Sequence, residues 1–265
     1  MEENNHISFA ESLQALRPIT LEEMDSIRLM NRIDTKYLTT EAVLLQILSA
    51  ATVAGYRVLT AADACINTYR SIYYDTAGLK MFYDHHNRRL VRQKVRTRIY
   101  VSSGDSFLEI KRKNNKGRTK KKRIGISSSE LMDFGADVRA CEYLASHSCF
   151  TAGELSPSVE TLFQRVTLVN PALTERITID TMLRFRNFRT GKETSLQDAV
   201  IIELKQDGRA FSQMKTILLN LRVKPVRVSK YCIALTLTDP LAKTGRFKEK
   251  VRMIEKTIGN KLVTI

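Results

Sequence analysis

A row of alternating cations is the feature that most constrains what this chain can fold into. In the stretch VRQKVRTRIY, residues 91–100, Arg92, Lys94, Arg96 and Arg98 stand at every second position. In a helix these side chains would be spread around the axis, whereas in a strand they share one face. Because like charges held side by side repel each other, this face predicts a strongly anionic ligand.

The same alternation recurs in five further segments. In SFLEIKRK, Glu109, Lys111 and Lys113 share one face, while Leu108 and Ile110 share the other. For one strand alone, a solvated sheet face is the simpler interpretation. Six such strands favour ionic faces that line a common channel, with the apolar faces turned outward against helices. The other alternating ionic positions are Arg32, Asp34 and Lys36; Lys121 and Arg123; Arg176, Thr178 and Asp180; and Glu203 and Lys205.

Turn signals between these segments predict an antiparallel arrangement. The stretches SSGDS (102–106) and NNKGR (114–118) are typical of hairpin turns. Helical patterns begin with a capped helix at 20–30 and end with a basic amphipathic helix at about 246–258. We therefore expect a single α+β domain over residues 1–265, built on a large antiparallel sheet or barrel. Strands are predicted at 31–38, 66–74, 91–101, 105–114, 119–126, 161–170, 174–183 and 198–206, and further helices at 39–51, 128–147, 211–221 and 230–237.

The charge balance favours an anionic partner. Lys and Arg number 43 against 28 Asp and Glu, which gives a formal net charge of +15. Such an excess is typical of proteins that bind nucleic acid, an anionic membrane or a polyphosphorylated ligand. No transmembrane segment is found, and the N-terminus MEENNHISFAESL lacks the features of a signal peptide, so we expect a cytoplasmic location. The stretch KRKNNKGRTKKKR could bind nucleic acid, yet most of its charges fit strand alternation.

Other familiar kinds of site find no support in the sequence. Neither glycine-rich phosphate loop motif is present. The four cysteines form no Cys-x-x-Cys pair and the histidines lack the H-E-x-x-H spacing, so a zinc site is not indicated. Adjacent His85 and His86 are interpreted as surface residues.

Nine short motifs run in order over nearly the whole chain: RIDTKYL, YRSIYYDT, KVRTRIY, FLEIKRK, KKKRI, FQRVTL, ERITIDT, VIIELK and VSKY. Together they resemble the polyphosphate polymerase domain of the vacuolar transporter chaperone (VTC) family, within the triphosphate tunnel metalloenzyme, or CYTH-like, superfamily. The resemblance implies an eight-stranded antiparallel β-barrel that forms a cation-lined tunnel, with helices packed around the outside.

The resemblance also implies a set of site residues. Glu203 matches the metal-binding glutamate, with Glu109 as a second carboxylate. One strand departs from other tunnel enzymes, because Asp34 and Arg32 stand where those carry a Glu-x-Glu-x-Lys pattern. The expected catalytic clamps on phosphate are Arg96, Arg98, Arg165 and Arg176, and the other expected phosphate-binding or lining residues are Lys36, Lys94, Lys111, Lys121, Arg123, Lys205, Arg227 and Lys230.

The function implied by the resemblance is metal-dependent phosphoryl transfer, most simply synthesis of inorganic polyphosphate from the γ-phosphate of ATP. Mg²⁺ or Mn²⁺ would be the cofactor, and a nucleoside triphosphate and polyphosphate would be the partners, with no specific nucleic acid. Two alternatives stay open. One is a triphosphatase or polyphosphatase with the same site, and the other is a non-catalytic module that binds a polyanion or nucleic acid.

Overall fold

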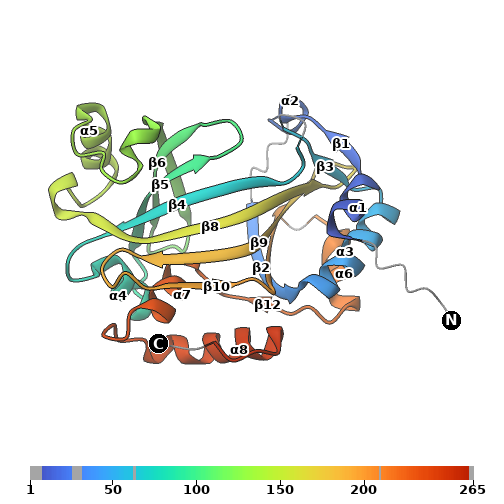
Figure 1. Ribbon diagram of the computed structural model, residues 1–265. Coiled ribbons are helices and arrows are strands. Elements are labelled where there is room, and N and C mark those ends of the chain that lie inside the picture. The colour runs from blue at the N-terminus through green and yellow to red at the C-terminus, as the bar shows by residue number, and fades with distance from the viewer. Residues whose placement is uncertain (1–7, 26–31, 62–63, 209, 263–265) are drawn as a thin grey trace.

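One twelve-stranded sheet organises the computed structural model, which describes residues 8–25, 32–61, 64–208 and 210–262 (Figure 1). Its antiparallel main path joins, in spatial order, β12 (Pro225–Val226), β2 (Arg32–Thr40), β11 (Ala199–Asp207), β9 (Glu175–Asn187), β8 (Ser156–Val169), β4 (Asn67–Asp75), β5 (Arg92–Tyr100), β6 (Ser106–Lys113) and β7 (Thr119–Gly125). Beside this path, β10 (Glu193–Leu196) pairs with β9, β3 (Arg57–Leu59) pairs with β8, and β1 (Arg17–Ile19) runs parallel to β3.

The expectation of a closed eight-stranded barrel is corrected by this sheet. It has twelve strands, and within the described ranges β7 and β12 are the two free ends of the main path. Two features work against pairing between these ends. β12 has only two residues, so it offers few backbone hydrogen bonds, and β7 carries cations on both faces, which disfavour pairing at a sheet edge. The sheet is nevertheless strongly curled, since residues of β2 and β7 line one common cavity. Register shifts in β4 and β8 mark bulges, which bend strands locally.

Alternation along each strand separates the two faces of the sheet, as predicted. In β11, Ile202 and Leu204 are fully buried on the convex side, while Glu203 and Lys205 face the cavity on the concave side. The apolar faces of β9 and β11 pack against α1 (Phe9–Gln14), α3 (Glu41–Val53) and α6 (Gln213–Asn220), which Figure 1 places together at one end of the sheet.

The convex face of β5 and β6 is covered by a second helical layer. The helix predicted over 128–147 is interrupted and forms a 3₁₀ turn, η1 (Ser128–Leu131), and then α5 (Val138–His147). The break has a local cause, because Asp137 caps α5 by accepting hydrogen bonds from the backbone N–H groups of Arg139 and Ala140. The helix predicted at 20–30 corresponds to α2 (Leu21–Asp25), and residues 26–31 lie outside the described ranges. A second 3₁₀ turn, η2 (Ala152–Glu154), precedes β8.

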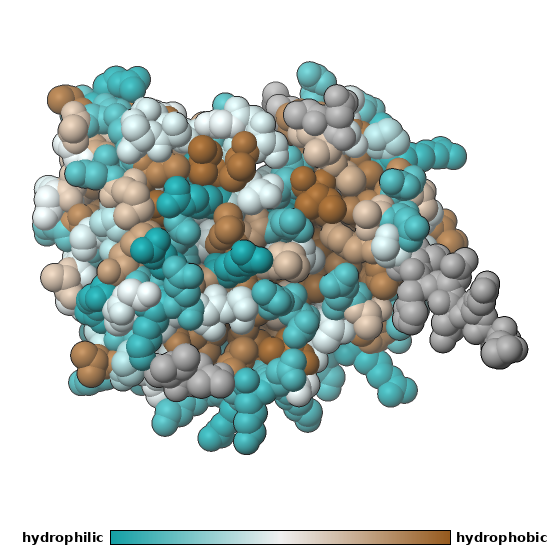
Figure 2. All heavy atoms as spheres, viewed as in Figure 1, coloured by the Kyte–Doolittle hydropathy of each residue, from teal (hydrophilic) through white to brown (hydrophobic). Residues whose placement is uncertain are grey.

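A buried helix packs against part of the concave face. All residues of α7 (Lys230–Thr238) after Lys230 are buried, and they pack against β8, β9 and β10 and against α4 (Lys80–His86). The basic C-terminal segment forms η3 (Gly245–Phe247) and α8 (Lys248–Ile258), which packs through Val251 and Ile254. Figures 1 and 2 together show hydrophilic side chains projecting at the lower edge of the view, where α8 lies. No helix in the described ranges has the length and apolar character that a membrane span requires.

Candidate functional site

The concave face of the sheet encloses a cavity of about 510 Å³. Thirteen Lys and Arg side chains of the described residues line it, against three carboxylates. The carboxylates belong to Asp34, Asp180 and Glu203, and the cations are Arg32, Lys36, Arg92, Lys94, Arg96, Arg98, Lys111, Lys113, Lys121, Arg165, Arg176, Lys205 and Lys230. This excess places many like charges close together in a confined space, so the cavity is suited to a multiply charged anion.

Strand register brings some of these cations directly opposite each other. Lys94 on β5 faces Lys111 on β6, and Lys205 on β11 faces Arg176 on β9. Like charges at directly opposed positions destabilise an antiparallel pair. The arrangement therefore costs stability unless an anion lies between the side chains.

Asp180 is held between two cations of the cavity wall. The guanidinium of Arg165 donates to it through Nε at 2.6 Å and Nη2 at 2.8 Å, and Lys230 at the start of α7 forms an ion pair with the same carboxylate. Burial alone would raise the pKa of Asp180, but Arg165 and Lys230 hold it well below its usual range. Asp180 thus stays charged and positions both cations.

Glu203 has a similar environment on β11. Lys36 of β2 forms an ion pair with it, and Lys205 Nζ lies 3.3 Å from its Oε2. Burial opposes ionisation, yet Lys205 and Lys36 hold the pKa of Glu203 well below its ordinary value. Its carboxylate is therefore ionised and available at the cavity surface.

Glu109 lies behind the cavity wall, where it does not belong to the lining. It is 0% exposed, accepts a hydrogen bond from Arg96 Nε at 2.7 Å, and forms an ion pair with Lys121. Burial alone would raise the pKa of Glu109, but Arg96, Arg98 and Lys121 hold it low. Its carboxylate thus fixes two lining cations, and the metal-binding role that the resemblance implies for it stays a prediction.

Arg98 and Lys111 have no carboxylate partner among the described residues. Arg98 is 5% exposed, donates to Ser71 Oγ at 2.8 Å, and lies 5.3 Å from the ring centre of Tyr69. Burial and then the charge of Arg96 lower the pKa of Arg98 to about 10. The charge of Arg96, followed by burial, holds the pKa of Lys111 well below its usual value. Both lowered pKa values indicate that the cavity wall by itself disfavours these charges.

The N-terminus of α7 also meets the cavity. Val228, Ser229 and Lys230 are among its lining residues, and Ser229 caps the helix by accepting from the N–H of Cys232 at 3.3 Å. Lys94 Nζ donates to the same hydroxyl at 2.7 Å. A helix N-terminus carries a partial positive charge, so α7 adds to the attraction for an anion.

Three side chains of the lining were not among the expected site residues. Asp180 was placed on the ionic face by its parity with Arg176, but no role was predicted for it. Tyr73 accepts a hydrogen bond from Arg96 Nη1 at 2.9 Å; burial would raise its pKa, but the charges of neighbouring cations lower the pKa of Tyr73 to about 8. The interpretation of His85 as a surface residue is wrong, because it is half-buried and lines the cavity.

Two of the expected phosphate-binding residues do not line the cavity. Arg123 is exposed and its guanidinium carbon lies 4.4 Å from the ring centre of Phe107. Arg227 is exposed just before α7. Apart from these two, every expected catalytic or phosphate-binding residue belongs to the lining.

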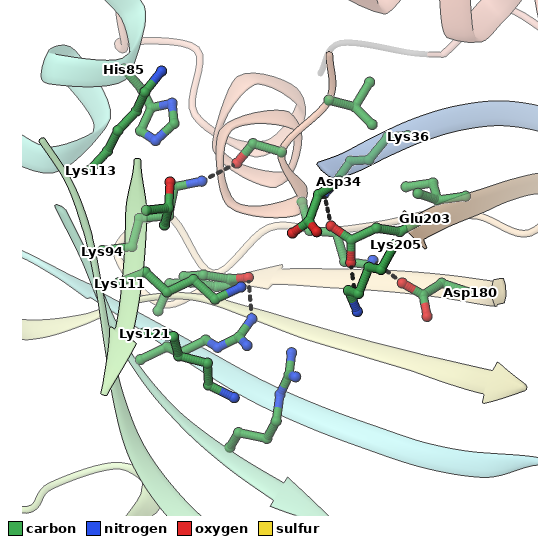
Figure 3. Close-up of a pocket in the computed structure, with 18 of the residues that line it drawn as sticks. Asp34, Lys36, His85, Lys94, Lys111, Lys113, Lys121, Asp180, Glu203 and Lys205 are labelled. Atoms are coloured by element: carbon green, nitrogen blue, oxygen red, sulfur yellow. Dashed lines mark hydrogen bonds and ion pairs between the residues drawn. The ribbon is translucent and has the colours of Figure 1, made fainter. Parts of the chain in front are cut away.

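The arrangement of acidic groups limits what kind of metal site is possible. No group of three or more His, Cys, Asp or Glu side chains in the described ranges could hold a metal ion by itself. Glu203 and Asp34 lie near each other at one end of the cavity (Figure 3). One or two carboxylates fit a divalent cation that takes its other ligands from phosphate and water.

The model of the VTC domain matches residues 31–238 of this sequence. The chain belongs to the VTC domain family. The matched range contains every lining residue, so the cavity is a feature of the VTC domain itself. No curated protein sequence matches the chain.

Several solved structures resemble the VTC domain more distantly. A putative adenylyl cyclase from Hippeastrum, described as having a dominant triphosphatase activity, is 14% identical, with a TM-score of 0.47, over 76% of this chain and 94% of its own. The PH1819 protein from Pyrococcus horikoshii is 13% identical, with a TM-score of 0.43, over 76% of this chain and 95% of its own. At these values no activity is carried over from either protein.

Proposed function

We propose that this VTC domain binds a nucleoside triphosphate in the cavity and transfers its γ-phosphate to the end of an inorganic polyphosphate chain. The observation that supports this is the lining of thirteen cations against three carboxylates within the described residues. A triphosphate or polyphosphate carries several closely spaced negative charges and can neutralise many of these cations at once. A ligand with a single charge would leave most of the repulsion in place.

The cations divide into two kinds by geometry. Arg96, Arg98, Arg165 and Arg176 present planar guanidinium groups, which can hold phosphate oxygens in pairs. Lysine side chains act as point charges along the phosphates. Phosphoryl transfer depends mainly on positioning and on neutralising charge, so this lining supplies what the reaction needs. The lysines of the lining are Lys36, Lys94, Lys111, Lys113, Lys121, Lys205 and Lys230.

Glu203 is the residue best placed to hold a divalent cation that arrives with the phosphates, with Asp34 beside it. Such a cation, Mg²⁺ or Mn²⁺, neutralises charge on phosphate oxygens when bound. Glu109 is less suited, because it is fully buried and does not belong to the cavity lining.

The state of the lining carboxylates favours transfer to phosphate over transfer to water. Asp180 and Glu203 are each held by two cations, and Asp34 accepts from Arg32 Nε at 2.6 Å. The lowered pKa values of Asp180 and Glu203 make these two carboxylates weak proton acceptors, so they activate water poorly. A terminal phosphate is already ionised at neutral pH and needs no such base.

An assay with ATP and Mn²⁺ tests the proposed function. Released phosphate and acid-insoluble polymer are measured in the same reaction, with Glu203→Gln as the inactive control. Polymer formation supports synthesis, whereas phosphate without polymer indicates a triphosphatase. Binding of triphosphate without turnover would reduce the domain to a polyanion-binding module and contradict the proposal.

A further inference from the structure

The β6–β7 hairpin carries more cations than the cavity uses. Residues 111–123, KRKNNKGRTKKKR, contain nine Lys and Arg side chains and no acidic residue. Because side chains alternate along a strand, Lys111, Lys113 and Lys121 face the cavity. Arg112 on β6 and Lys120 on β7 occupy the opposite face.

The outward cations of the hairpin are exposed to solvent. Arg112 stands directly opposite Lys120, and Lys122 stands beside them on β7. Lys116 and Arg118 in the turn are also exposed. No carboxylate of the described ranges forms an ion pair with any of these five, although exposed cations elsewhere do pair, as Lys80 does with Asp84. Two like charges in directly opposed positions repel each other, so a bound anion would stabilise this face.

Helix α5 covers only part of this face of the hairpin and does not bury Arg112, Lys120 or Lys122. The apolar half of the same face, with Ile110 and Ile124, packs in one cluster with Leu144 of α5. Arg112, Lys120 and Lys122 lie further toward the turn and stay exposed. β7 is also a free end of the main sheet path within the described ranges.

The hairpin continues directly from one end of the cavity. Lys113 and Thr119, which flank the turn, both belong to the cavity lining. Figure 3 shows Lys113, Lys94 and His85 together on one side, away from the carboxylates of Glu203 and Asp34 on the other. This end of the lining therefore presents cations without an acidic residue.

We propose that the outer hairpin surface, defined as Arg112, Lys116, Arg118, Lys120 and Lys122, binds the part of a polyphosphate chain that extends beyond the cavity. This inference rests on the proposed function. A flexible chain with a charge at every phosphate can pass from Lys113 over the turn onto Arg112 and Lys120. The surface has no aromatic side chain for stacking bases and no apolar side chain to enter a membrane, so a polyphosphate fits it better than nucleic acid or lipid.

The test compares two triple variants of equal charge. The hairpin variant is Arg112→Gln, Lys120→Gln and Lys122→Gln in one chain. The control is Lys215→Gln, Arg222→Gln and Lys224→Gln, which removes three exposed cations from α6 and the segment after it. Binding of triphosphate and of long-chain polyphosphate is measured for both at several salt concentrations. Lys116→Gln with Arg118→Gln, confined to the turn, serves as a second hairpin variant should the first unfold.

We expect the hairpin variant to lose roughly tenfold in affinity for long-chain polyphosphate, with a shallower salt dependence, because fewer phosphate contacts remain. Its affinity for triphosphate should match wild type, and the control should bind both ligands normally. Unchanged polyphosphate affinity, or an equal loss in the control, would overturn the inference. Single-stranded DNA and anionic vesicles are titrated in parallel, and a larger loss of affinity for either of them than for polyphosphate would also overturn the inference. Failure of wild type to bind triphosphate would instead contradict the proposed function.

Discussion

The two faces of the sheet meet opposite physical demands although they are made by the same strands. On β11, Ile202 and Leu204 lie fully buried against helices, while Glu203 and Lys205 between them line a charged cavity. Burial of the first pair stabilises the fold through the hydrophobic effect. The second pair faces side chains whose charges repel each other unless a ligand is bound.

Because neighbouring residues of a strand lie on opposite faces, one residue contributes to stability and the next contributes to ligand binding. A substitution at a convex position should change the free energy of unfolding and leave ligand binding unchanged in the protein that remains folded. A change at a concave position should act mainly on ligand binding and chemistry, and removal of a cation there can even reduce the repulsion between the cations of the lining. Predictions that compare neighbouring positions on opposite faces therefore test the account.

The largest effect is expected on the convex face. Leu204→Ala removes a fully buried side chain from the cluster formed with α3 and α6, so it should lower the free energy of unfolding by about 2–5 kcal/mol. Leu219→Ala on α6, where the side chain is 74% exposed, is the matched control and should change stability little. Urea unfolding measures both, and equal effects would contradict the assignment of the convex face as core.

The next effect concerns chemistry on the concave face. Glu203→Gln keeps the shape of the side chain but removes its charge, so metal-dependent turnover should fall by at least about a hundredfold. Glu160→Gln removes a carboxylate that pairs with Arg70 outside the cavity lining and should leave turnover near wild type. If Glu203→Gln retains full metal-dependent turnover, the metal is held elsewhere.

A third prediction concerns a single guanidinium. Arg98→Ala should weaken triphosphate binding by about 1.5–3 kcal/mol, since a charge-assisted contact is lost. Arg98→Lys should recover only part of this, because an ammonium group lacks the planar fork. Isothermal titration of triphosphate into the three proteins gives the values. Equal affinity of the alanine variant and wild type would show that Arg98 does not contact the ligand.

The pH dependence of stability should also reflect the cavity. Burial would raise the pKa of Tyr73, but nearby cations lower it to about 8, and burial lowers the pKa of Lys94. Above about pH 8 the folded protein releases the Tyr73 proton, which the unfolded chain retains up to about pH 10, and the folded protein also releases the Lys94 proton at a lower pH than the unfolded chain does. The free energy of unfolding of the ligand-free protein should therefore rise by about 1–2 kcal/mol between pH 8 and 10. Tyr73→Phe should reduce this rise, and a flat or falling profile in wild type would contradict the expected charge repulsion.

Much of the concave face was predictable because alternation is a local property. The parity of Arg92, Lys94, Arg96 and Arg98 is fixed by the strand alone, and the family resemblance placed the cations of distant strands in one site. That the sheet stays open was not predictable, because it depends on whether β7 and β12, which are far apart in sequence, pair with each other in space.

The roles of the individual carboxylates could not be predicted from the sequence either. Glu109 and Glu203 stand on similar alternating strands, yet register places Arg96 and Arg123 opposite Glu109 and Lys36 opposite Glu203. Which carboxylate is enclosed follows from these pairings and from the depth of each side chain. His85 gave no signal, because α4 is short and its approach to the cavity is set by tertiary packing.

The central claim, that the cavity is built for a polyanion, is tested most directly at Lys111. This side chain lines the cavity opposite Lys94 and forms no ion pair in the described ranges. Lys111→Met keeps the chain length and removes the charge, with the exposed Lys215→Met as control. Thermal unfolding without ligand and calorimetric titration of triphosphate are measured on the same samples. The account predicts that Lys111→Met is as stable as wild type or more stable, by up to about 1 kcal/mol, while its triphosphate affinity falls. Lower ligand-free stability together with unchanged affinity would contradict it.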